Sequence, residues 1–320
     1  MSSLLKLRAS MLGTLTIIIG LSTLFFAVLL QLIVGFDLYL LIFFVVGFNI
    51  LQWLISPYLI DAIYRARPVS QSENPELYAV VEQLSQKSGI KKPRLMLARI
   101  PIPNAFAYGS PIAGSRVAVT EGLVKTLDKG EVEAVIGHEL GHLKHRDVQV
   151  MMFVSILPAI FYYIGFSFLF SSMFGRRGRD SSGGAAAIIG LASIVLYWIL
   201  TIFILYLSRL REYYADRHSS SIVEDGHRKL SSGLAKIVYA SGRMKRKTPQ
   251  SGQLNAFKAL FISDPDKAAA DAQAMAQYGS DQRLVDKILQ RKVTGWDRLL
   301  ELLSTHPNIV KRLKALQRLS

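Results

Sequence analysis

The sequence predicts a mainly α-helical integral membrane protein with four transmembrane helices and a soluble α+β part that carries a small β-sheet. Three observations support this fold class. The chain of 320 residues is 51% hydrophobic and only 19% charged. It contains four long uncharged stretches, and β-like runs lie between the second and the third. Having no cysteine, it forms neither disulfides nor thiolate metal sites.

Each of the four uncharged stretches is about long enough to cross a bilayer. They are residues 11–34, 38–60, 148–174 and 185–207. The first two are expected to form a helical hairpin. A cleaved signal peptide is the alternative for the first stretch, but its apolar region is too long and no small-residue cleavage site follows. Pro158 lies within the third stretch and predicts a kink there.

Basic residues flank these stretches mostly on one side. They are Lys6, Arg8, Arg65, Arg67, Lys144, Arg146, Arg209 and Arg211. Because Lys and Arg accumulate on the cytoplasmic side, we expect both termini and the soluble part in the cytoplasm, and a multi-pass protein of the cell (inner) membrane. Arg176, Arg177 and Arg179 argue the other way, so a partly re-entrant or tilted second pair stays an alternative.

The spans divide the chain into four segments. Residues 1–64 are the amino-terminal transmembrane hairpin, 65–147 the first soluble part, 148–208 the second transmembrane pair and 209–320 the second soluble part. The two soluble parts are expected to form one domain, because the candidate metal ligands described below are shared between them.

The first soluble part is expected to fold as helix, strands and helix. Asn74 before a proline is typical of a helix start, and Gly89 of a helix end. Residues 94–100 and 116–120 are expected as short strands flanking 102–109. That middle segment is either an edge strand, whose free amides and carbonyls can pair with an extended polypeptide, or part of a plain hairpin with its aromatic side chains in the core.

The strongest local signal is the run HELGH at residues 138–142. Residues four apart lie one above the other on a helix, so His138 and His142 can point two imidazole nitrogens at one metal ion. Glu139 then lies beside the metal, where a carboxylate can accept the proton of an attacking water. Asp128 is the expected cap of this helix. The alternative is a pair of core histidines bonded to nearby carbonyls.

A catalytic metal centre needs a third protein ligand and one open position. Glu212 is the candidate, since it shares a helix face with Asp216 shortly after the fourth apolar stretch. One carboxylate of such a pair can bind the metal while the other accepts the N–H of a ligand histidine. Acids four residues apart are otherwise common on solvated helix faces.

The carboxy-terminal part gives weaker signals. Residues 219–241 are expected to continue the helix of Asp216, 244–252 to form a basic loop, and 264–290 to form an exposed helical insertion, because little core periodicity is visible there. A net charge of +15 suggests nucleic acid as a partner. Much of the excess borders the apolar stretches, however, so we expect lipid headgroups and no nucleic acid.

Together these motifs resemble those of the HtpX-type integral-membrane zinc metalloproteases, in the superfamily of the membrane prenyl-protein endopeptidases. The resemblance covers nearly the whole chain, from the amino-terminal hairpin through HELGH and the Glu212-x-x-x-Asp216 pair to the Thr-His-Pro run around His306. It implies a zincin-like α+β metalloprotease domain on the cytoplasmic side. The segment that is thought to hold substrate as a strand in that family is matched by Asn104, Ala105, Phe106 and Ala107.

The resemblance also implies the roles of individual residues. One Zn2+ ion per chain would be bound by the two histidines of HELGH and Glu212, with Asp216 supporting a ligand histidine and Glu139 as general base. His306 and Arg312 would face the oxyanion. Without the resemblance, a histidine before a proline is an ordinary capping or turn residue.

HtpX proteins are associated with quality control of membrane proteins under stress. The expected function is therefore a membrane-embedded zinc endopeptidase that cuts cytoplasmic or juxtamembrane segments of membrane proteins, in particular misfolded ones. Its partners would be membrane-protein or unfolded polypeptide substrates and the lipid bilayer, with the oligomeric state open. The alternatives are a dedicated processing protease of prenyl-protein type, for which four spans are few, and a non-catalytic zinc-containing scaffold or chaperone, against which Glu139 argues.

Overall fold

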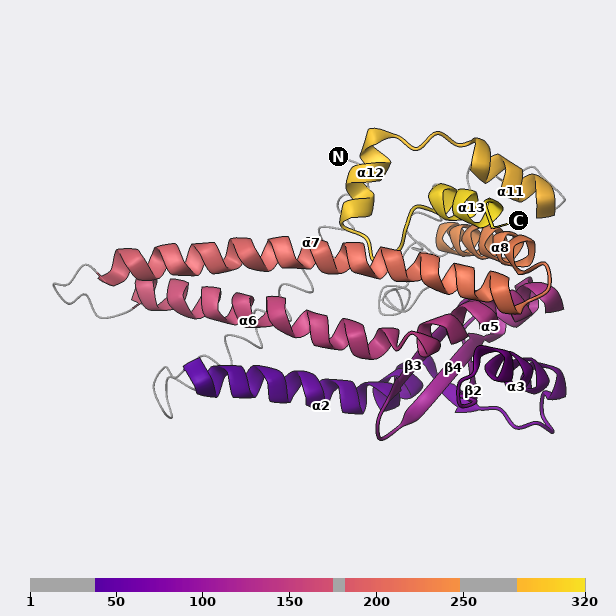
Figure 1. The fold of residues 1–320 in the computed structure, drawn as a ribbon, viewed down its shortest axis with the longest axis horizontal. Helices are drawn as coiled ribbons and strands as arrows, with labels where there is room; N and C mark the ends of the chain where they lie inside the picture. Colours follow the sequence, from indigo (N-terminus) through magenta and orange to yellow (C-terminus); the bar gives the residue numbers. More distant parts are fainter. Residues whose placement is uncertain (1–37, 175–181, 248–280, 320) are drawn as a thin grey trace. The chain divides into compact units, whose positions relative to one another are not determined.

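The computed structural model describes residues 38–174, 182–247 and 281–319 (Figure 1). The chain divides into two units. Unit 1 comprises Met1–Gln52 and Met151–Ile204, and unit 2 comprises Trp53–Val150 and Leu205–Ser320. Three long helices contribute to both units: α2 (Leu38–Tyr64), α6 (Asp147–Phe174) and α7 (Ser182–Ile222).

These three helices correspond to the second, third and fourth predicted spans. Within the described residues, they are the helices long and apolar enough to cross a membrane, over Ile42–Tyr64, Asp147–Met173 and Gly184–Ile222. The helix α6 continues through Pro158. The first predicted span, residues 11–34, lies outside the described residues. Membrane-length helices are thus confirmed for three of the four predictions.

In unit 1, glycines set the spacing between α6 and α7. A Cβ atom on Gly165 would lie 2.8 Å from the side chain of Ile194, and one on Gly190 would lie 2.8 Å from a leucine of α6. Small residues allow close helix approach in membrane bundles, where packing replaces the hydrophobic effect between helices. The helix α2 packs against α6 through a small buried cluster that includes Val45 and Tyr163.

Unit 2 contains a mixed four-stranded sheet. Its strands are β1 (Ala66–Pro68), β2 (Arg94–Ala98), β3 (Ala105–Ser110) and β4 (Gly114–Thr120). The order is β1-β2-β4-β3, with β2 and β4 parallel and the other neighbours antiparallel. The segment around residues 102–109 therefore provides an edge strand. Strand β1 was not predicted, because three residues including a proline give no recognisable period.

Side chains alternate between two cores along each strand, as the pleat requires. On β4, Val117 and Val119 face the main core, to which helices α3 (Pro75–Ser88) and α5 (Lys129–Lys144) contribute, while Ala118 faces a second core. That second core contains Phe106 of β3 and Tyr64 at the end of α2, with ring centroids 4.9 Å apart. Strand β3 is thus an edge strand and also buries its aromatic residues, so both alternatives for this segment hold in part.

Among the described residues, unit 2 also contains the helices α3 (Pro75–Ser88), α4 (Glu121–Thr126), α5 (Lys129–Lys144), α8 (Gly226–Lys247), α11 (Asp281–Gln290), α12 (Gly295–Leu302) and α13 (Ile309–Gln317). The predicted caps are present. Asn74 Oδ1 accepts a hydrogen bond from the amide of Leu77, and Gly89 adopts the left-handed conformation with φ 67° at the end of α3. Asp128 and Glu131 form a capping box at the start of α5, which satisfies amides that the helix leaves free.

Three carboxy-terminal predictions need correction. Residues 244–247 form the end of helix α8 and not a loop, and residues 248–252 of the predicted basic loop lie outside the described residues. The helix of Asp216 does not continue to residue 241, because α7 ends at Ile222 and α8 begins at Gly226 after a turn with Asp225 at φ 53°. Residues 281–290 are not an exposed insertion but the amphipathic helix α11. Its apolar side packs into the main core next to α8 and α13. The buried residues of that side are Leu284, Val285 and Ile288. Residues 264–280 lie outside the described part.

The contact that positions the site is the one between α5 and α7 in unit 2. A Cβ atom on Gly137 would lie 3.1 Å from Oγ of Ser219, and one on Gly141 would lie 3.0 Å from Cα of Ala215. The Ser219 hydroxyl also donates to the carbonyl of Ala134 at 2.6 Å. Glycine at these two positions lets the backbones of α5 and α7 approach closely.

This contact generates a prediction. Gly141→Val should lower the stability of the protein by about 1–3 kcal/mol, because the added atoms overpack a close helix contact, and it should weaken zinc binding by moving α7 away from α5. Gly295→Val is the matched control, since a Cβ atom there meets nothing within 4 Å. Melting temperature and zinc content in detergent are the measurements. Equal values for the two variants would contradict the account.

Candidate metal centre

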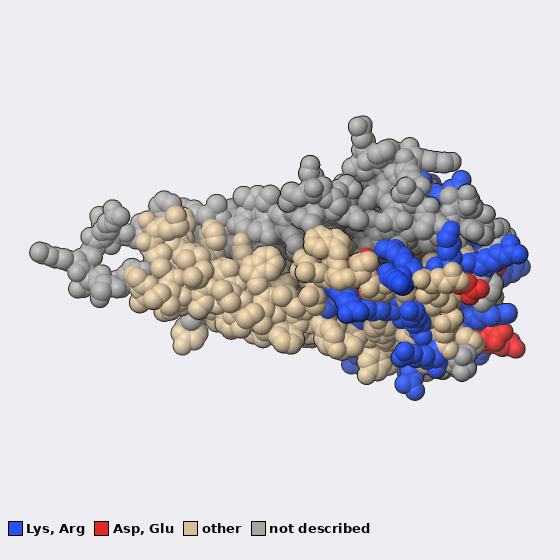
Figure 2. Space-filling model, turned by 90° about the horizontal axis from the view of Figure 1, so that it is seen from above, with Lys and Arg blue, Asp and Glu red and all other residues tan. Residues whose placement is uncertain are grey.

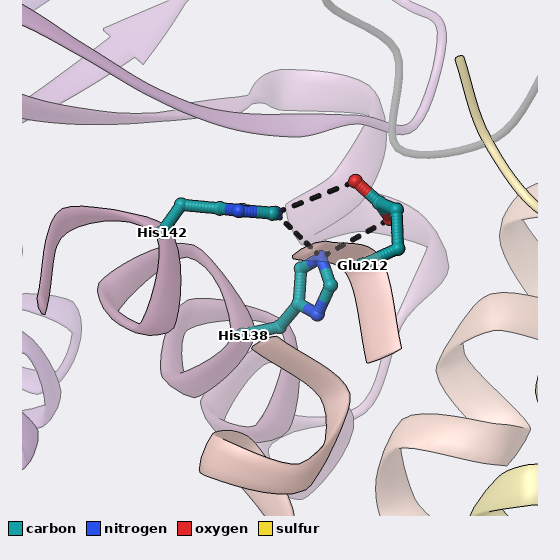
Figure 3. Close-up of side chains that lie close together, drawn as sticks. All are labelled: His138, His142 and Glu212. Atoms are coloured by element: carbon teal, nitrogen blue, oxygen red, sulfur yellow. Dashed lines mark hydrogen bonds and ion pairs between the residues drawn. The ribbon is translucent and has the colours of Figure 1, made fainter. Parts of the chain in front are cut away.

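The first two ligands come from the buried helix α5. His138 is fully buried and Glu139 is 3% exposed. One turn separates His138 from His142, so the rings lie on the same side of α5, with centroids 4.7 Å apart. The Nε2 atoms of the two histidines are 3.2 Å apart and face each other (Figure 3).

The helix α7 brings Glu212 to the same point. Its Oε2 lies 3.6 Å from His138 Nε2 and its Oε1 lies 3.5 Å from His142 Nε2. The ligand atoms of the three residues all lie within 4.8 Å of one another. The sequence prediction that residues 138, 142 and 212 converge is therefore met in space.

The spacing fits a tetrahedral zinc ion. With bonds of about 2.0–2.1 Å at tetrahedral angles, two zinc ligands lie about 3.3 Å apart, close to the three separations found here. The Oε2 atom of Glu212 is buried and makes no hydrogen bond among the described residues, although Nη1 of Arg312 lies 2.9 Å away. Two imidazoles and one carboxylate leave one tetrahedral position open, which is typical of catalytic zinc sites.

Two carboxylates hold the other nitrogens of the histidines. Asp216 Oδ1 lies 2.9 Å from His138 Nδ1, as predicted for Asp216. Asp147 Oδ2 lies 2.6 Å from His142 Nδ1. Each carboxylate accepts a hydrogen bond from Nδ1–H, which leaves Nε2 as the nitrogen that would bind a metal. The sequence analysis missed Asp147. Its position five residues after the second histidine, at the start of an otherwise uncharged helix, is the signal that could have indicated it.

The electrostatics of the centre favour a cation. Burial lowers the pKa of His142, but the hydrogen bond that its Nδ1–H donates to Asp147 and the charges of Glu212 and Glu139 raise it to about 9. In the absence of metal, both ring nitrogens of His142 therefore carry a proton at neutral pH, and the ring is positively charged. A metal ion must displace one of these protons, so metal affinity should fall as the pH drops below about 9.

Arg312 lies at the back of the centre. It is 2% exposed and donates to both oxygens of Asp216, from Nε at 2.7 Å and from Nη2 at 2.6 Å. Burial lowers the pKa of Arg312, but the charges of Asp216 and Glu212 raise it further than burial lowers it. Its guanidinium thus interacts with Asp216, which orients a ligand, and with Glu212, which is itself a ligand.

His306 lies on the other side of Glu212. Its Nδ1 is 3.3 Å from Glu212 Oε1, is buried and makes no hydrogen bond among the described residues. Arg209 of α7 holds the loop that carries it, donating from Nη1 to the carbonyls of Glu301 at 2.8 Å and Ser304 at 2.7 Å. Sequence reasoning used Arg209 for membrane orientation only and missed this contact, which links positions 95 residues apart.

The predicted substrate segment, residues 104–107, lies close to helix α5. Asn104 is 1% exposed, and its backbone N–H donates to Oγ1 of Thr120 at 2.9 Å. Ala105 begins the edge strand β3, which packs against α5. The segment therefore lies at the edge of the sheet, and the strand that it begins packs against α5, the helix that carries two metal ligands and Glu139.

A histidine pair one helical turn apart, a glutamate from a second helix and an acid beside the first histidine define the centre of a zinc metallopeptidase, here in a chain with membrane-length helices. Comparison with known proteins agrees. Residues 71–320 match peptidase family M48. A protease HtpX homolog of Thermoplasma acidophilum is 39% identical over 281 residues, covering 85% of this chain and 82% of the relative. A protease HtpX homolog of Aeropyrum pernix is 38% identical over 274 residues, covering 85% and 83%.

The fold is similar to that of a solved structure. The crystal structure of S. mikatae Ste24p superposes with a TM-score of 0.58 at 18% sequence identity. The match covers 95% of this chain, which spans 64% of the length of that one. The chain thus belongs to peptidase family M48, as a zinc-binding membrane metalloprotease of the HtpX group.

The geometry predicts a difference between Glu212 and Asp216. Glu212→Ala removes a ligand and should strip the zinc, whereas Asp216→Ala removes only a partner of His138 and should weaken zinc binding by about 10–100-fold. Metal analysis of the two purified variants distinguishes them. Full zinc occupancy in Glu212→Ala would assign the third ligand to another residue.

Proposed function

We propose that the protein is a membrane-embedded zinc endopeptidase that hydrolyses peptide bonds in cytoplasmic or juxtamembrane segments of membrane proteins, in particular misfolded ones. The observation that carries the proposal is the buried His-His-Glu cluster with Glu139 on the same helix. Family membership supports polypeptides as the substrate class. The quality-control role rests on the similarity to HtpX homologs.

In this proposal His138, His142 and Glu212 bind one Zn2+ ion per chain. When bound, zinc would act as a Lewis acid and would lower the pKa of a water molecule that it binds. Asp216 and Asp147 keep the two imidazole rings oriented by holding their Nδ1 protons. The residues around the metal are thus fixed before a substrate binds.

Proton transfer is assigned to Glu139. Its carboxylate follows His138 directly on α5, and its charge is felt by both His142 and Arg312. Glu139 accepts a proton from the attacking water and later returns it to the departing amine. One carboxylate can serve both steps because, once protonated, it stays within reach of the departing amine.

His306 is assigned to the developing oxyanion. It lies beside Glu212, with its Nδ1 3.3 Å from Oε1, so its imidazole is close enough to the metal centre to donate to charge that develops there. Arg312 was also expected to face the oxyanion. Because its guanidinium is bound by Asp216, we assign it to positioning the ligands and balancing their charge.

Substrate binding is assigned to the edge strand β3. The segment Asn104 to Ala107 begins this strand, whose only neighbour in the described sheet is β4. An extended polypeptide can add to the free edge through backbone hydrogen bonds, with little dependence on its sequence. Such binding suits a protease that acts on unfolded segments of many proteins.

The first experiment tests Glu139 as the base. Glu139→Gln keeps the ligands and should keep its zinc while losing peptide cleavage by on the order of 10²-fold or more. Zinc content and casein cleavage by the detergent-purified protein are measured side by side with the unaltered protein. Near-normal turnover in the variant would refute the assignment.

The second experiment tests His306. A donor directed at developing charge should lower kcat by about 10²–10³-fold when it is removed, with little change in KM. His306→Ala should therefore keep its zinc and its melting temperature and turn over slowly, and His306→Asn, which retains a donor, should recover part of the rate. A rise in KM alone, or loss of the fold, would indicate a structural role.

The third experiment tests the side of the membrane. A reporter active only in the cytoplasm should be active when fused after Arg67, after Asp147 or at Ser320, and inactive near Asp37, because basic residues flank the spans on one side. Activity of a fusion at Arg176 would show that α6 and α7 do not both cross.

A further inference from the structure

Helix α12 carries an exposed apolar face. The side chains of Trp296, Leu299 and Leu302 are 47%, 51% and 50% exposed. They are three residues apart, so they lie along one side of the helix. Leu300 and Glu301 are buried, so the apolar face occupies one side of α12 and another side of the helix is covered by the protein. An apolar face of this kind is costly to leave in water.

The contacts of Arg209 fix where the end of this helix lies. Arg209 Nη1 donates to the carbonyls of Glu301 and Ser304, at the carboxy-terminal end of α12. Arg209 follows Leu207, the last residue of the uncharged stretch 185–207 of α7, by two positions. Two residues of helix correspond to about 3 Å. The end of α12 is therefore held at the level where the apolar stretch of α7 gives way to charge.

The polar surroundings of α12 are basic. Its two acids are paired: Asp297 lies 3.4 Å from Nη2 of Arg291, and Glu301 is buried and bound to Lys311. Lys292 and Arg298 are exposed. On the face seen in Figure 2, basic side chains likewise outnumber acidic ones. Tryptophan, leucine and basic residues together are the composition of helices that lie in the interface of an anionic bilayer.

We propose that α12 is an interfacial membrane helix. Trp296, Leu299 and Leu302 insert by about 5–10 Å into the boundary between headgroups and acyl chains, and the exposed basic residues contact anionic headgroups. The partner of this surface is the bilayer itself. The helix thereby ties the loop of His306 to the membrane surface, where chain segments leaving the bilayer are within reach. The peptidase chemistry itself does not require this contact.

Tryptophan fluorescence of the full chain tests the proposal. The sequence contains three tryptophans, so Trp53→Phe with Trp198→Phe leaves Trp296 as the sole reporter. The variant is reconstituted in vesicles of phosphatidylcholine and phosphatidylglycerol, with lipids brominated either near the headgroup or near the chain end. Trp53→Phe with Trp296→Phe is the matched control, because Trp198 lies within the apolar stretch of α7. Zinc content verifies the fold of each variant.

We expect Trp296 emission to be blue-shifted, to resist iodide, and to be lost most strongly with bromine near the headgroup, whereas Trp198 loses most with the deeper bromine. Leu299→Asp with Leu302→Asp should keep zinc and abolish the lipid quenching of Trp296. Iodide quenching without lipid quenching would overturn the proposal in favour of a water-exposed face. Blue-shifted emission that neither agent quenches would also overturn it, and would indicate that residues 1–37 or a second copy covers α12.

Discussion

The close contact between α5 and α7 is the constraint on which the metal centre depends. Gly137 and Gly141 bring the two backbones together, and Ser219 fastens them with a hydrogen bond to α5. Only at this separation can Glu212 reach the two histidine nitrogens. The glycine inside HELGH therefore has a structural reason of its own, because any larger side chain there would meet Ala215 of α7.

Charge balance is the second requirement of the centre. Three buried acids of α5 and α7, Glu139, Glu212 and Asp216, converge where burial would otherwise disfavour their charged forms. Arg312 offsets part of this charge through Asp216 and Glu212. A zinc ion offsets the rest, so metal binding and the stability of the ionised site are linked. Glu139 and Glu212, together with Asp147, also raise the pKa of His142 when no metal is present.

The sequence predicted those features that depend on local spacing. The turn between His138 and His142, the cap at Asn74 and the three membrane-length helices all follow from short-range patterns. Contacts between residues far apart in the sequence were harder to predict. Asp147 and the clamp of Arg209 on the loop of His306 carry no motif, and the core residues of α11 were hidden in a polar, alanine-rich stretch. Predicting them requires the tertiary packing that brings the segments together.

The central claim is that one zinc ion is bound by two imidazoles from α5 and one carboxylate from α7. X-ray absorption of the zinc-loaded, detergent-purified protein measures this directly. The account predicts one zinc per chain, with two nitrogen ligands of imidazole character at about 2.0–2.1 Å and the remaining ligands oxygen. A spectrum that requires three or more imidazoles, or zinc bound at a small fraction of one per chain in active protein, would contradict it.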